Sequence, residues 1–95
     1  MKNQYCIIRC DRAGVFAGTI KERNGREVTL TNARRLWRWY GALTISDLAV
    51  EGTTDPGRCR FTLEVPEITL LEAIEIVPCS VKAEKSIREV PVWKM

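Results

Sequence analysis

The dipeptide Asn24-Gly25 constrains the fold of this chain more than any other feature, because it is a preferred turn of two-stranded β-hairpins. A strict two-residue loop would mix polar and apolar residues on both faces of the hairpin. A three-residue loop with a bulge at Gly25 pairs Ile20 with Val28 instead, and it gathers the apolar side chains of both strands on one face. We therefore predict the bulged hairpin. Its apolar face comprises Phe16, Ile20, Val28 and Leu30.

Residues 5–10 and 15–22 are rich in β-forming residues and are joined by a turn with Gly14. With the hairpin they form a meander of three strands. Residues 59–65 show the clearest alternation in the chain and predict a fourth strand, which Pro66 ends. The inward side chains of this strand are Cys59, Phe61, Leu63 and Val65.

Residues 68–77 again have period two, interrupted at Glu72, where a bend or bulge is expected. A helix is the alternative for this segment. The side chains expected to share one face are Ile68, Leu70, Ile74 and Ile76.

Two helices are predicted from their capping residues. Thr44 and Asp47 resemble a capping box, which starts a helix over about 45–50 that ends at Gly52. Ser80 can cap a second helix over about 81–90, which Pro91 ends. Val92 and Trp93 then either pack back or contact a neighbouring molecule.

The chain of 95 residues is short enough for a single domain, 1–95. The elements predict an α+β fold, with a small, mainly antiparallel sheet or partly open barrel of five to six strands. Two short helices complete it, one of them C-terminal. No apolar stretch approaches the roughly 20 residues of a membrane span, so we expect no membrane partner.

The chain has no histidine, which excludes Ser-His-Asp and Cys-His catalysis and His-ligated metal sites. Its carboxylates are scattered over outward positions, so we predict no enzyme, no catalytic residue, no metal and no cofactor. The four cysteines form no C-x-x-C pair. We expect free, buried thiols of a cytoplasmic protein, with a Cys10–Cys59 disulfide as the alternative. The cysteines are Cys6, Cys10, Cys59 and Cys79.

The net charge of +3 is unevenly distributed. Residues 1–40 hold nine Lys/Arg and three Asp/Glu, whereas residues 41–95 hold six and nine. Opposite charges on the two halves can attract each other between subunits, and a core this small gains from association. These features predict a homo-oligomer.

The segment 33–41 is the unusual part of the sequence, with three arginines and three aromatic residues within 34–40. Its aromatic content and the closing Gly41 favour a strand, and a helix is the alternative. Guanidinium groups bind phosphate in a bidentate manner and aromatic rings stack on bases, so we predict a ligand or partner site here. Arg34 and Arg35 are expected at the surface, while Trp37 fits either a core or a stacking position. The candidate residues are Arg34, Arg35, Trp37, Arg38, Trp39 and Tyr40.

The pattern Ala-Arg-Arg-Leu-Trp-x-Trp-x-Gly-Ala over 33–42 resembles a family of small proteins encoded by bacteriophages and prophages. Further matching features are Ala13-Gly14-Val15, Glu51-Gly52-Thr53 and Val90-Pro91-Val92-Trp93, so the similarity spans nearly the whole chain. The resemblance carries no functional residue with it. It implies a phage gene product that acts in the cytoplasm of a bacterial host.

These observations lead to one main hypothesis and two alternatives. The main hypothesis is a small, non-enzymatic binding protein that counteracts host defence by sequestering a phosphate-bearing, nucleotide-type ligand. The first alternative is a protein–protein inhibitor of a host or defence enzyme, since Trp, Tyr and Arg dominate interface hot spots. The second is a nucleic-acid-binding accessory protein, which the modest net charge and the acidic second half disfavour.

Overall fold

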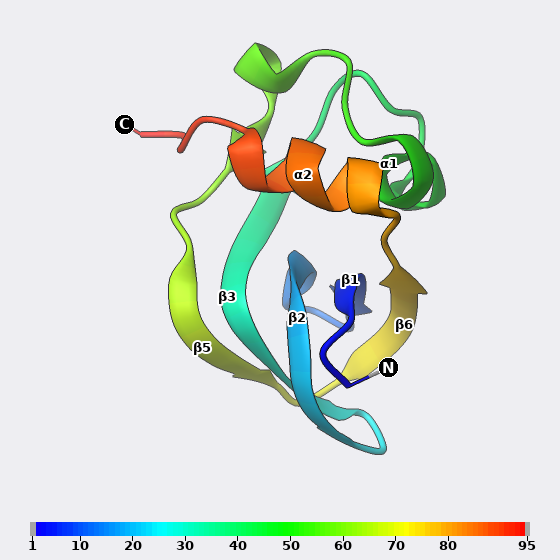
Figure 1. The fold of residues 1–95 in the computed structure, drawn as a ribbon. Helices are drawn as coiled ribbons and strands as arrows, with labels where there is room; N and C mark the ends of the chain where they lie inside the picture. The colour runs from blue at the N-terminus through cyan, green and yellow to red at the C-terminus, as the bar shows by residue number, and fades with distance from the viewer. Residues whose placement is uncertain (1, 95) are drawn as a thin grey trace.

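The computed structural model describes residues 2–94 and shows a six-stranded sheet with two α-helices (Figure 1). The predicted α+β class is confirmed, including the C-terminal helix. The elements are β1 (Tyr5–Cys10), β2 (Gly14–Asn24), β3 (Glu27–Arg38), α1 (Ile45–Glu51), a short 3-10 turn (Pro56–Arg58), β4 (Arg60–Phe61), β5 (Val65–Leu70), β6 (Ala73–Pro78) and α2 (Val81–Glu89).

The sheet is antiparallel throughout, with the order β4-β3-β2-β1-β6. β5 also pairs with β3, so β4 and β5 lie one after the other along the same edge of that long strand. β5 and β6 follow each other in the chain, yet they pair with β3 and β1, on opposite sides of the sheet. The sheet therefore curls, as Figure 1 shows, with β5 and β6 at its two sides and the helices packed at one end.

Strand alternation creates two apolar clusters. The helix-side core packs the helices against one face of the sheet, and the inner core is enclosed by the curl of the sheet. β1 contributes to both, because only Arg9 of its six residues is exposed. The helix-side core includes Tyr5, Ile7, Ala17, Leu36, Leu48, Phe61 and Ile87. The inner core includes Cys6, Ile8, Phe16, Ile20, Val28, Leu30 and Leu70.

The predicted bulged loop at Gly25 is wrong, although the predicted apolar face is confirmed. Asn24 pairs with Glu27, so the loop contains only Gly25 and Arg26. The extra residue lies within the strand, between Ile20 and Glu22, where the register shifts. This bulge restores the inward direction of Ile20, and so the burial of the apolar side chains determines the register.

The predicted continuous strand over 59–65 is also wrong, because only Arg60–Phe61 form β4 and Leu63 is 58% exposed. Thr62 still donates its N–H to the carbonyl of Arg35 at 3.0 Å, but its own carbonyl oxygen accepts from Nε of Arg34 at 2.8 Å. Residues 63–64 then leave the ladder. Pro66 does not end a strand but lies within β5. An edge strand tolerates proline because its N–H can face away from the partner strand.

The expected interruption at Glu72 is confirmed, and it separates two strands rather than bending one. Ile68 and Leu70 point toward the inner core as predicted. Ile74 is 46% exposed and does not share their face, since Ala73 takes the buried position beyond the turn.

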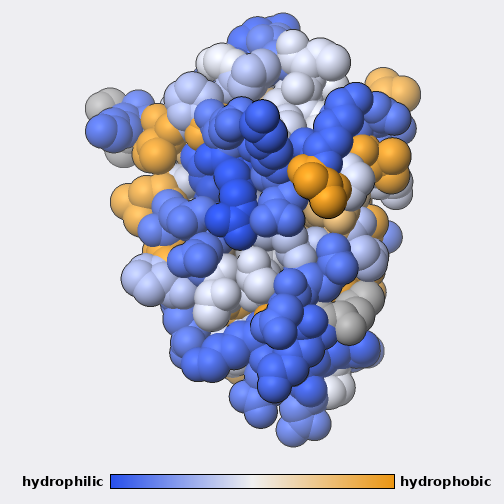
Figure 2. All heavy atoms as spheres, viewed as in Figure 1, coloured by the Kyte–Doolittle hydropathy of each residue, from blue (hydrophilic) through white to orange (hydrophobic). Residues whose placement is uncertain are grey.

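Both helices have the predicted caps. Thr44 and Asp47 form the capping box of α1, and Gly52 follows the helix with φ 76°. Ser80 accepts a hydrogen bond from the N–H of Ala83 and caps α2. In the view of Figure 2 the surface over α2 and the β2–β3 hairpin is mainly hydrophilic, and the apolar groups are small and separate.

Candidate functional site

The segment 33–41 is extended as predicted, and its side chains do not form one site. β3 carries the segment as far as Arg38, and alternation sends Arg34 and Leu36 toward the helices. Arg35 projects to the opposite face, over the ring of Phe16. The residues proposed from the sequence are thus divided between the core and the surface.

Arg34 is 3% exposed and belongs to the core, which corrects its expected place at the surface. Its Nη1 donates to the carbonyl oxygens of Ile87 and Val90, each at 2.8 Å, at the C-terminal end of α2. Burial lowers the pKa of its guanidinium, partly offset by Tyr5 and Glu64. Arg34 therefore holds α2 against the sheet and has no exposed group for a ligand.

Trp39 and Tyr40 also serve the packing. Trp39 is half-buried against the helix-side core. The half-buried ring of Tyr40 lies 4.2 Å from the guanidinium carbon of Arg58, and its backbone N–H contacts the sulfur of Cys59 at 3.4 Å. Both aromatic rings are therefore only partly accessible, and their predicted part in a ligand site stays a prediction.

Trp37 is the exposed aromatic residue of the segment, at 51% exposure. Its ring is parallel to that of Trp93, with centroids 5.0 Å apart and an angle of 2° between the planes. The C-terminal tail brings Trp93 there, because Val92 bridges to Phe61 and the N–H of Trp93 donates to the carbonyl of Phe61 at 2.9 Å. The tail thus packs back, which is one of the two predicted alternatives.

Two arginines adjoin this tryptophan pair. Arg38 of β3 and Arg60 of β4 are register partners, so two like charges lie opposite each other across the strands. The guanidinium carbon of Arg38 lies 5.2 Å from the Trp37 ring, and that of Arg60 lies 5.3 Å from both rings. Within the described part of the chain, neither arginine has a carboxylate partner.

We call the set Trp37, Arg38, Arg60 and Trp93 the Trp–Arg surface. Opposed like charges destabilise a strand pair, so an anion bound between them would relieve repulsion. Cation–π contacts of exposed groups contribute only about 0.5–1 kcal/mol each, which leaves the guanidinium donors available to a ligand. The arrangement can stack an aromatic ring and bind an anionic group.

Sequence reasoning missed Arg60 and Trp93 as members of this surface. Arg60 stands at an outward position of an alternating segment, which is an ordinary place for a solvated side chain. Its position opposite Arg38 depends on the pairing of β4 with β3, and no local signal reveals that pairing.

The four cysteines are buried as predicted, and all are free. Burial raises the pKa of the Cys6 thiol to about 11 and that of Cys79 to about 12. Such thiols stay protonated at neutral pH and are poor nucleophiles. Among residues 2–94, no group of three or more metal-ligating side chains is close enough to hold a metal ion.

Residues 3–87 match the family model described as Domain of unknown function (DUF6948). The chain belongs to this family. The DUF6948 match includes Trp37, Arg38 and Arg60 and ends before Val92 and Trp93. No curated protein and no solved structure gives a significant match to the chain. No helix of this DUF6948 member, within residues 2–94, has the length and apolar character needed to cross a membrane.

Proposed function

We propose that this protein is a non-enzymatic binding protein whose Trp–Arg surface captures a phosphate-bearing, nucleotide-type ligand. The observation that carries the proposal is the opposed pair Arg38 and Arg60 beside two exposed, parallel tryptophan rings. The two guanidinium groups supply donors for a phosphate. The exposed parts of the two rings supply a platform for a base, with stacking worth about 1–3 kcal/mol per base.

The biological setting of the proposal comes from the resemblance to phage and prophage proteins. In that setting, the protein acts in the cytoplasm of a bacterial host. It counteracts defence by sequestering a nucleotide signal, which requires binding and no chemical step. Capture of a signal fits an exposed site that holds its ligand by charge and stacking.

The proposal is tested by titrating a panel of mononucleotides, cyclic dinucleotides and ADP-ribose while following tryptophan fluorescence. A bound base should quench the emission of Trp37 and Trp93, because stacking on the indole rings perturbs them directly. Tripolyphosphate serves as the matched anion without a base. Weaker binding of tripolyphosphate than of nucleotides is expected, since it cannot stack.

Variants then assign the binding to this surface. Trp37→Ala and Arg60→Gln should each weaken nucleotide binding at least about tenfold. Arg60→Lys keeps the charge but not the guanidinium fork, so it should restore binding only partly. Arg23→Gln, at an exposed arginine of β2 whose Nε donates to the Gly25 carbonyl, is the control and should bind like the parent. The proposal is wrong if no nucleotide binds, or if the Trp37 and Arg60 variants bind like the parent.

A second candidate function is the inhibition of a host protein through the same surface. Val92 is 42% exposed beside Trp93, and this aliphatic side chain offers contact area that a phosphate ligand would not use. Trp and Arg are also enriched among interface hot spots. This second function is favoured if no nucleotide binds to the protein and if Val92→Asp abolishes its counteraction of host defence.

Adding a single-stranded oligonucleotide to the same titration tests whether the protein binds nucleic acid. Its affinity should fall steeply between low and physiological salt if several phosphates are contacted. The two opposed arginines provide few such contacts, so we expect a shallow salt dependence and a preference for small nucleotides.

A further inference from the structure

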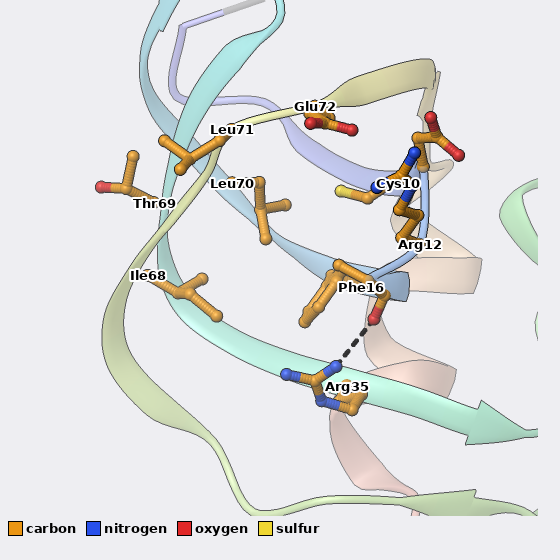
Figure 3. Close-up of a pocket in the computed structure, with 11 residues that line it drawn as sticks. Cys10, Arg12, Phe16, Arg35, Ile68, Thr69, Leu70, Leu71 and Glu72 are labelled. Carbon is orange, nitrogen blue, oxygen red and sulfur yellow. Dashed lines mark hydrogen bonds between the residues drawn. The ribbon is translucent and has the colours of Figure 1, made fainter.

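A cavity of about 410 Å³ lies on the face of the sheet that Arg35 occupies, apart from the Trp–Arg surface. β5 forms one side of it, and the turn between β1 and β2 forms another (Figure 3). At one end these parts are tied together, because the N–H of Asp11 donates to the carbonyl of Glu72 at 2.9 Å. The cavity lies where β5 and β6 diverge to opposite sides of the sheet, beside the buried side chains of Phe16 and Leu70. We call it the seam pocket.

The floor of the seam pocket is apolar. In Figure 3 the side chains of Phe16, Ile68 and Leu70 lie around its open space. Phe16 and Leu70 are members of the inner core, and Ile68 is half-buried beside them. The volume falls within the range of sites that hold small organic molecules, and the pocket is open to solvent on one side.

Arg35 provides a positioned cation at the edge of this floor. Its Nη1 donates to the carbonyl of Ala13 at 2.8 Å, and its guanidinium carbon lies 4.5 Å from the centre of the Phe16 ring. These two contacts restrain the guanidinium but occupy only one of its five donors. Arg35 forms no ion pair within the described residues, so its other donors remain open to an anion.

The charges around the rim limit the size of that anion. Arg12 stands on the β1–β2 turn, where its backbone adopts a φ of 69° that is uncommon for arginine. Asp11 and Glu72 line the same pocket and balance the two arginines. A group with one negative charge can bind at Arg35, whereas the two carboxylates would repel the additional charges of a polyphosphate. Cys10 completes the wall as a neutral thiol, since burial raises its pKa.

We propose that the seam pocket binds a small monoanion with an aromatic body, of the chemical class of aromatic carboxylates. The apolar body packs on Phe16, Ile68 and Leu70, and the carboxylate receives hydrogen bonds from Arg35. This site does not rest on the function proposed for the Trp–Arg surface, because the two share no residue.

The test uses 2-naphthoate as the probe and follows amide shifts by NMR on isotope-labelled protein. Millimolar 2-naphthoate should shift amides in 10–16 and 68–72. The neutral analogue 2-naphthylmethanol should bind at least about tenfold more weakly, because it lacks the anion. Equal binding of the two, or no shift at these amides, would overturn the proposal.

Three variants assign the effect to the pocket. Arg35→Gln should weaken 2-naphthoate binding at least about tenfold, and Ile68→Trp should block it by filling the cavity. Ile68 is half-buried against the inner core, so the NMR spectrum of Ile68→Trp must first show that this variant is folded. Arg23→Gln, at an exposed residue outside both sites, is the control and should bind 2-naphthoate like the parent. If Arg35→Gln, shown to be folded by its NMR spectrum, also binds like the parent, the site is wrong. Nucleotide binding by Arg35→Gln tests the Trp–Arg surface separately.

Discussion

At the scale of single residues, Arg34 makes the contacts that matter most for the stability of the fold. Four carbonyl oxygens, those of Phe61, Thr62, Ile87 and Val90, accept hydrogen bonds from its guanidinium. A hydrogen bond to a charged group contributes about 1.5–3 kcal/mol, and a buried carbonyl left without a donor is costly. The side chain thus connects β3, the chain after β4 and the end of α2.

We expect Arg34→Met to lower the free energy of unfolding by at least about 3 kcal/mol, because it leaves buried carbonyl groups unpaired. Urea denaturation measures the loss. Arg38→Met, at an exposed position with no hydrogen bond to the described residues, is the matched control and should change stability by less than about 0.5 kcal/mol. Equal stability of the Arg34 variant and the parent would contradict the structural role of Arg34.

Tyr5 presents the opposite case, a buried polar group that lacks a partner. Its hydroxyl is buried without a hydrogen bond to any described residue, and burial raises its pKa above the ordinary value. We expect Tyr5→Phe to increase the free energy of unfolding by about 1 kcal/mol, since the desolvated hydroxyl is removed. Thermal denaturation measures the gain. A less stable Tyr5→Phe variant would show that the hydroxyl is satisfied in solution.

At the scale of elements, Gly52 sets how closely α1 and α2 approach. Its φ of 76° and ψ of −161° lie in a region that is essentially restricted to glycine. A Cβ atom at this position would come within 2.5 Å of Cβ of Ser86 on α2. Conformation and packing therefore both require glycine here.

We expect Gly52→Ala to destabilise the protein by at least about 3 kcal/mol, the combined cost of strain and overpacking. Gly25→Ala is the matched control, because Gly25 has φ 63° and a Cβ atom added there would meet no other atom within 4 Å. It should cost about 1–2 kcal/mol from strain alone. Urea denaturation of both variants separates the two costs. Equal losses would show that the helices can move apart.

At the scale of the whole molecule, the buried thiols predict how stability depends on pH. A cysteine in an unfolded chain ionises near pH 8.5, whereas burial raises the pKa of Cys6 to about 11. The unfolded state then loses its proton first as the pH rises. The protonated thiol of Cys6 therefore contributes fully to the free energy of unfolding below about pH 8.5. This contribution is lost progressively toward pH 11.

We expect the urea midpoint of the parent to fall between about pH 9 and 11. The double variant Cys6→Ala with Cys79→Ala separates the contribution of these thiols from that of other groups that lose protons at high pH. Its decline over the same interval should be shallower, although its stability at pH 7 is lower. Parallel declines of the two proteins would contradict the thiol contribution.

The homo-oligomer expected from the charge asymmetry stays a prediction. Several large apolar side chains are exposed on the single chain, among them Leu63, Leu71 and Ile74. Burying them between subunits would add to a small core. Light scattering at micromolar concentration should give a multiple of 10.8 kDa, and a mass of 10.8 kDa would refute the expectation.

Features that depend on neighbours in the chain could be predicted from the amino-acid sequence alone. The capping residues predicted both helices, and period two predicted β1 to β3 and the break at Glu72, because these signals act over a few residues. The exposed Trp37 and Arg38 were also among the predicted site residues.

Features that depend on contacts between distant segments emerged only from the folded chain. The residues 59–65 have the pattern of one strand, yet Arg34 and the two partners of β3 divide them. Arg34 and Arg35 are adjacent and chemically identical, but one is buried under α2 and the other lines the seam pocket. Arg60 and Trp93 join Trp37 only because β4 and the tail pair at that edge. Long-range pairing depends on burial summed over the whole fold, which no local pattern records.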